Sequence, residues 1–262
     1  RYRVGTDTVE VSLAAVPNGP ALAARLPQTN RDPIRDFSLQ VNDATRTALL
    51  EFNACTFGED NYLNRFLDSA FTELKERGVT DLIIDIRRNG GGGTGPVDEL
   101  FQYISPVPFR QFDKGIIKIS DPLKAAYPAL SAQRNGRHHA RIRRLIPLRD
   151  NPLRFTGRMY LLTSSYTFSS AKDLAWAFRY FGMGTVIGEE TGGTVVSFGN
   201  AYQFRMPNTR CVYSVSGKRF YGYGARNNGT RGVIPDIGVP AAQALDTALG
   251  LITQVQRQSV AD

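Results

Sequence analysis

The sequence predicts a mixed α/β protein with a core built on a largely parallel β-sheet. Two segments carry this prediction, residues 81–104 and residues 159–181, because each runs from an apolar strand through a turn into an amphipathic helix. Strands buried on both faces are continuous apolar runs, and strands that alternate with helices pair in parallel. Ligands bind such sheets beyond the carboxyl ends of the strands. We therefore expect a functional site where the two turns lie.

The first strand–turn–helix segment is preceded by β structure. Alternating β-branched residues on both sides of Gly5–Asp7 predict a hairpin over residues 2–13, and a Pro- and Asn-rich connector follows to Asp36. Asn42 and Asp43 mark the turn between two further strands. Apolar residues at three- and four-residue steps then predict a helix over residues 61–77 that Gly78 ends.

The second segment is followed by a strand at residues 184–189, by β-hairpins after Gly193, and by an amphipathic helix to about Val255. These features divide the chain into three parts: a β-rich segment over residues 1–45 that ends a longer N-terminal region, a core over residues 46–240, and a C-terminal helix over residues 241–262. A chain of 262 residues is long enough to bury a substantial core.

The net charge of +8 is concentrated in residues 134–149, which hold six arginines together with His138 and His139. Such a patch could bind nucleic acid, an anionic membrane surface or an acidic peptide. A solvated loop is the plainer interpretation. No aromatic residue lies among these arginines to stack on bases, and no nucleic-acid-binding motif accompanies them, so nucleic acid is not an expected partner.

The cysteines and histidines predict no metal site and no other cofactor. Cys55 and Cys211 lack CxxC spacing, and they could form one disulfide or stay as free thiols. His138 and His139 are adjacent rather than one helical turn apart. The chain has no apolar run of membrane-spanning length and no signal peptide at Arg1, which suits a mature, processed or truncated soluble protein.

Four successive glycines, Gly90–Gly93, follow the first buried strand. They let the backbone turn sharply and expose amide groups to an anion or an oxyanion. A phosphate-binding loop would need Lys-Ser/Thr after its last glycine, but Gly95 is followed by Pro96. A flexible turn with no ligand is the alternative for this motif taken alone.

Ser169 lies in the second turn, where the later strand gives way to its helix. A serine at a helix N-terminus is placed where developing negative charge is stabilised. On local grounds, however, helix capping is the commoner role for such a serine. Ser164, Ser165 and Ser170 share this ambiguity.

Four motifs in order resemble the C-terminal processing (tail-specific) serine peptidase family, and most of all its tricorn-core-like branch. The similarity extends over about residues 47–240. The motifs are DLIIDIRRNGGGG, YLLTSSYTFSSAKDLAWAF, VIGEETGG and RGVIPDIGVP. The resemblance implies a ClpP/crotonase-like core with β-rich N-terminal and C-terminal extensions. It also implies a serine endopeptidase that acts on peptides or unfolded proteins through an acyl-enzyme, in the periplasm or outside the cell.

The family's site residues transfer to positions in this sequence. Ser169 corresponds to the nucleophile, and the amides of Gly91 and Ser170 correspond to the oxyanion hole. Gly92 and Thr194 are the expected substrate-binding neighbours. The acyl-enzyme chemistry needs no cofactor or metal.

The general base is where the sequence departs from the family. One branch has a lysine where Thr194 stands, and the other has a histidine in an Asp-Gly-His motif that this chain lacks. That second branch also has a glutamate where Gly229 stands. The base is therefore expected outside this sequence, on an N-terminal fragment or a further chain. Three side chains are the internal alternatives: His138, His139 and Lys172, which lies one helical turn after Ser169.

Two other functions are open for this sequence. A catalytically inert family member could keep the peptide groove as a binding module, which the missing lysine, histidine and glutamate favour. A scaffold or a carrier of apolar ligands on the same fold is the third possibility, and it has only analogy behind it.

Overall fold

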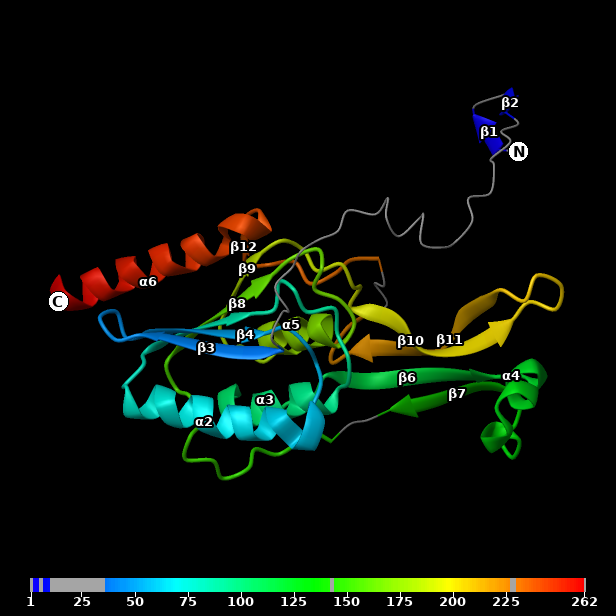
Figure 1. The fold of residues 1–262 in the computed structure, drawn as a ribbon, viewed down its shortest axis with the longest axis horizontal. Coiled ribbons are helices and arrows are strands. Elements are labelled where there is room, and N and C mark those ends of the chain that lie inside the picture. Colours follow the sequence, from blue (N-terminus) through cyan, green and yellow to red (C-terminus); the bar gives the residue numbers. More distant parts are fainter. Residues whose placement is uncertain (1, 5–6, 10–35, 142–143, 227–229, 262) are drawn as a thin grey trace. The chain divides into compact units, whose positions relative to one another are not determined.

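A computed structural model describes the backbone of residues 2–4, 7–9, 36–141, 144–226 and 230–261 (Figure 1). Side chains are described for residues 36–141, 144–226 and 230–258. The chain divides into two units, residues 1–34 and residues 35–262. In the first unit, β1 (Tyr2–Val4) and β2 (Asp7–Val9) pair antiparallel, which confirms the predicted hairpin. The predicted connector between residue 10 and residue 35 lies outside the described residues.

The second unit is built on a six-stranded sheet with the order β12-β9-β8-β5-β4-β3. All neighbours pair in parallel except β3 and β4. This arrangement confirms the mixed α/β fold with a largely parallel sheet. The strands are β3 (Phe37–Asn42), β4 (Thr47–Phe52), β5 (Asp81–Asp85), β8 (Arg158–Thr163), β9 (Thr185–Gly188) and β12 (Ile237–Gly238).

Helices cover both faces of this sheet. The central strand β5 is buried throughout, and its side chains alternate between two apolar clusters. Leu82 and Ile84 join the cluster that holds α2 (Tyr62–Glu76), α3 (Gly95–Ile104) and α5 (Ser170–Tyr180). Ile83 joins the cluster that holds α6 (Ala244–Ala261). This alternation is the period of two that a strand imposes on its side chains.

A second, antiparallel sheet extends from the core in the order β10-β11-β6-β7 (Figure 1). Its members are β6 (Phe112–Ile119), β7 (Gly136–Arg141), β10 (Val196–Arg205) and β11 (Val212–Gly222). α4 (Asp121–Ala126) and the short 3₁₀-helix η2 (Pro128–Leu130) lie between β6 and β7. The other 3₁₀-helices are η1 (Glu59–Asn61) and η3 (Ala241–Gln243).

Three expectations from the sequence need correction or refinement. The basic stretch 134–149 is not a simple loop, because residues 136–141 pair with β6 as strand β7. The last helix continues to Ala261 rather than ending near Val255, since no glycine or proline follows Gly250 to stop it. The boundary expected at residue 45 falls in the turn between β3 and β4, so β3 is part of the core sheet.

No helix of the described residues is long and apolar enough to span a membrane. The same residues contain no cluster of three or more His, Cys, Asp or Glu side chains that could hold a metal ion.

Candidate active site

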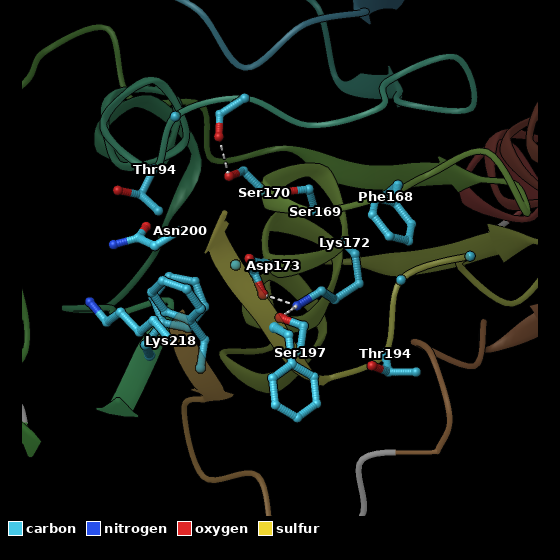
Figure 2. Close-up of a pocket in the computed structure, with 18 residues that line it drawn as sticks. Thr94, Phe168, Ser169, Ser170, Lys172, Asp173, Thr194, Ser197, Asn200 and Lys218 are labelled. Atoms are coloured by element: carbon cyan, nitrogen blue, oxygen red, sulfur yellow. Dashed lines mark hydrogen bonds and ion pairs between the residues drawn. The ribbon is translucent and has the colours of Figure 1, made fainter. Parts of the chain in front are cut away.

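The two predicted turns meet at one end of the parallel sheet. β5 leads into the turn that contains Gly90–Gly93, which we call the glycine turn. Its neighbour β8 leads into the turn that ends at Ser169. The Phe168 amide donates to the Asn89 carbonyl at 3.1 Å, and the Ser170 hydroxyl donates to the Gly92 carbonyl at 2.7 Å. Figure 2 shows Ser169 and Ser170 together on this side of the pocket. The structure thus brings together Ser169, Ser170 and the glycine turn.

Ser169 has an unusual backbone conformation. Its φ of 50° and ψ of −127° place a non-glycine residue at positive φ, which costs on the order of 1–3 kcal/mol and is typical of functional sites. Ser169 occupies the N-cap position of α5, but its side chain makes no capping hydrogen bond. The Ser169 hydroxyl therefore does not cap helix α5, although capping is the commoner role for a serine at this position. The exposed side chain is free to act at a helix N-terminus.

The glycine turn approaches Ser169 so closely that only glycine fits. A Cβ added at Gly91 would lie 2.5 Å from the Ser169 Cβ and 2.9 Å from the Phe168 carbonyl oxygen. At Gly92 it would lie 2.2 Å from the Cys55 carbonyl oxygen. Both glycines have positive φ, at 107° and 142°. Close approach thus explains two of the four glycines, whereas a Cβ at Gly90 would meet nothing within 4 Å.

Asn89 is the buried hub of this turn, a role that the sequence did not assign to it. Its Nδ2 donates to the Phe52 carbonyl at 2.8 Å, and its Oδ1 accepts the Gly91 amide at 2.8 Å. The Cys55 thiol also contacts Oδ1, at 3.6 Å, and burial raises the pKa of this thiol to about 12. Asn89 thus connects the glycine turn to the segment that holds Phe52 and Cys55, a role that is seen only in the folded structure.

The amides around Ser169 differ in their hydrogen bonding. In this structure the Gly91 amide is occupied by Asn89. Within the described part of the chain, the amides of Gly92 and Ser170 have no acceptor. Ser170 is the first residue of α5, where an amide has no partner inside the helix.

A pocket of about 640 Å³ opens at this site. It is bounded by both turns, by Thr194 and by the start of the second sheet, and its lining includes four phenylalanines. Those are Phe112, Phe168, Phe198 and Phe220. The expected neighbours Gly92 and Thr194 therefore both line the pocket, and the Thr194 hydroxyl donates to the Val196 carbonyl at 2.8 Å.

A buried charge pair lies in the wall of the pocket. The Lys172 ammonium binds the Asp173 carboxylate and donates to the Ser197 hydroxyl at 3.2 Å, as Figure 2 shows. Lys172 is fully buried, and burial raises the pKa of Asp173 to about 6. Because Asp173 and Ser197 hold the ammonium, Lys172 is not poised to accept the Ser169 proton. Sequence spacing alone could not show this pairing.

The other internal candidates for a base do not reach this pocket. His138 and His139 lie on β7, and neither lines the pocket. The His138 ring nitrogen Nε2 is 2.6 Å from the Arg134 carbonyl oxygen. Gly229, which stands at the position of the family glutamate, lies outside the described residues.

The VIGEETGG and RGVIPDIGVP motifs are joined to each other beside the site. Glu190 binds Arg231 at 2.6 Å and accepts the Gly232 amide at 2.7 Å, and these contacts lower the pKa of its carboxyl group. The Thr191 hydroxyl accepts the Val233 amide at 2.8 Å. The VIGEETGG and RGVIPDIGVP segments therefore form one connected support for the wall that carries Thr194.

Comparison with known proteins agrees with this arrangement of fold and site. The sequence model described as Peptidase family S41 matches residues 51–239, well over half of the chain. The chain therefore belongs to peptidase family S41. A search of curated proteins found no significant match.

Solved structures share the fold at low sequence identity. Mature CPAF is 12% identical over 84% of this chain and 52% of its own, with a TM-score of 0.60. A protein of Parabacteroides merdae assigned as a peptidase is 18% identical over 86% of this chain and 67% of its own, with a TM-score of 0.59. The photosystem II D1 C-terminal processing protease is 18% identical over 78% and 48%, with a TM-score of 0.50. This chain thus spans between about half and two thirds of their lengths.

Proposed function

We propose that this protein is a serine endopeptidase in which Ser169 attacks the peptide carbonyl and forms an acyl-enzyme. The observation that carries the proposal is the placement of Ser169. Its hydroxyl is exposed in a pocket, at a positive φ and at a helix N-terminus, with no capping hydrogen bond. A serine held for packing or capping has no need of this combination.

The amides of Ser170 and of the glycine turn would hold the oxyanion. Such donors contribute on the order of 2.7–4 kcal/mol each to the transition state. Ser170 offers an amide without a partner in the described part of the chain. For Gly91, the expected second donor, the hydrogen bond to Asn89 must first give way, whereas the adjacent Gly92 amide is free among the described residues. With Gly91 as the donor, substrate binding would include a rearrangement of this turn, and with Gly92 as the donor it would not.

The general base is proposed to come from residues outside this sequence, on an N-terminal fragment or on a further chain. The support is chemical: no histidine lines the pocket. Of the two lysines that line it, Lys172 is held by Asp173 and Ser197, and the Lys218 ammonium lies over the Phe220 ring. Peptides or unfolded proteins are the proposed substrates. An exported location, periplasmic or extracellular, is a further proposal that follows from the family resemblance.

Hydrolysis of an unfolded protein tests this function. The full-length protein should cleave reduced, alkylated casein, and Ser169→Ala should lower the rate by a factor of at least about 10³, as removal of a serine nucleophile does. Ser165→Ala is the matched control, because Ser165 is an exposed serine of the same turn. Equal loss in both variants, or undiminished cleavage by Ser169→Ala, would refute the assignment.

An inert peptide-binding module is the second candidate. It is favoured by one observation: within the described residues, the Ser169 hydroxyl has no hydrogen-bonded base. This alternative predicts peptide binding that Ser169→Ala leaves unchanged and no turnover by the full-length protein.

A further inference from the structure

One face of the second sheet carries a cluster of basic side chains around the apolar Ile116. Directly paired residues of antiparallel strands point to the same face. The register pairs Lys114 with Arg141 and Lys118 with Arg137, and Ile116 lies between His139 and Arg219. We call this cluster the basic face, and it comprises Lys114, Lys118, Arg137, His139, Arg141 and Arg219.

The basic face has no internal counter-charge. Asp113 is the one acidic residue in the four strands, and it lies on the opposite face, where it accepts the Gly224 amide. Within residues 36–141, 144–226 and 230–258, no lysine or arginine of the basic face forms an ion pair. Unneutralised cations on a surface favour an anionic partner.

Arg219 lies at the centre of the basic face and has a hydrogen-bond donor without an acceptor. Its guanidinium lies over the rings of Phe198 and Tyr221, at 5.5 Å and 5.1 Å from their centroids. Its Nε is buried and has no hydrogen-bond partner. A hollow of about 290 Å³ adjoins it, bounded by Ile116 and by Phe198, whose side chain is 68% exposed.

This hollow adjoins the Ser169 pocket across strand β10. Phe198 and Lys218 line both spaces. β10 is an edge strand in the described part of the chain, and along it Ser197 and Gly199 face the pocket while Phe198 pairs with Arg219 on the basic face. A polypeptide that leaves the pocket over this edge therefore reaches the basic face.

We propose that the basic face is an exosite for an acidic stretch of the polypeptide substrate. The proposal rests on the proposed function for its choice of occupant, and charge complementarity and continuity with the pocket support it. The three strand spacings from β10 to β7 amount to roughly 14 Å, which about four extended residues span. An acidic stretch of about four extended residues would therefore cover the basic face from β10 to β7.

Peptide binding to the Ser169→Ala chain tests the exosite without turnover. The probes are two fluorescent 14-residue peptides that share one uncharged half, followed by a block of Asp and Glu or by the matching Asn and Gln. Fluorescence polarisation should show the acidic peptide binding at least about tenfold more tightly in 50 mM salt, with an advantage that shrinks in 300 mM salt.

Variants that remove positive charge show where on the protein the acidic peptide binds. Lys118→Gln/Arg137→Gln should weaken acidic-peptide binding about fivefold to tenfold, as the loss of two exposed ion pairs does. Arg65→Gln/Lys75→Gln on α2 removes the same charge elsewhere and should change it less than twofold. Circular dichroism of each variant checks that the fold is kept.

Three results would overturn the exosite: equal binding of both peptides, equal effects of the two double variants, or tighter charge-dependent binding of phosphatidylserine vesicles or single-stranded DNA. Failure of the proposed function is distinguishable. If the full-length protein cleaves nothing while the acidic peptide still binds the basic face, the nucleophile assignment fails and the exosite stands. If the full-length protein cleaves substrates without a preference for acidic ones, the exosite fails and the nucleophile assignment stands.

Discussion

At the residue scale, the site depends on a contact that only glycine allows. Gly91 has a φ of 107°, and a Cβ there would lie 2.5 Å from the Ser169 Cβ. The sequence predicts that the glycine cluster and Ser169 act together, and the structure places them in contact. Asn89 lies within the motif DLIIDIRRNGGGG, but its role could not be predicted, because the segments that it joins are far apart in the sequence.

Gly91→Ala should therefore displace Ser169 without unfolding the protein. We expect casein cleavage to fall by a factor of about 10² or more, since a misplacement of about 1 Å in an active site has that effect. Gly90→Ala is the matched control, as its Cβ would meet nothing within 4 Å. Cleavage rates that fall equally in the two variants, or in neither, would contradict a specific role for the Gly91 contact.

At the scale of the element, α5 combines Ser169 at its start with a buried charge pair one turn later. The sequence predicts the helix from its apolar face and places Lys172 on the side of Ser169. It does not predict the partner of Lys172, because Ser197 comes from β10 and the pairing depends on how the second sheet meets the core. The same long-range packing explains why β6 and β7 were not recognised.

Lys172→Met should destabilise the protein by about 3–5 kcal/mol, because it leaves Asp173 as an unpaired buried charge. Lys172→Met/Asp173→Asn should recover most of the loss, while Lys75→Met on the exposed side of α2 should cost less than about 0.5 kcal/mol. Urea unfolding at pH 7 measures all three. A single variant as stable as the wild type would show that the pair is not buried as described.

The same pair should make stability depend on pH. Burial raises the pKa of Asp173 from an ordinary 3.8 to about 6, so the folded state binds the proton more tightly than the unfolded state. The stability contributed by protonation is present below pH 3.8 and is lost as the pH rises through about 6. The wild type should therefore lose stability over this range relative to Lys172→Met/Asp173→Asn. If the difference in unfolding free energy between the two proteins does not change with pH, the raised pKa of Asp173 is refuted.

At the scale of the whole molecule, the ordered motifs were enough to predict the α/β core and the family. Strand β5 and helix α5 are strongly patterned, and short turns place their ends together. The second sheet is less predictable, since β7 is a basic edge strand whose side chains are mostly exposed and its pattern resembles a solvated loop. The base remains a proposal, because the family's lysine position holds Thr194 and the described pocket contains no histidine.

The central claim is that Ser169 is an activated nucleophile, and labelling by a fluorophosphonate probe tests it most directly. After incubation of the full-length protein, tandem mass spectrometry should find one adduct on Ser169 and none on Ser165 or Ser170. Ser169→Ala should abolish it. No adduct at Ser169, under conditions that label a control serine hydrolase, would contradict the account.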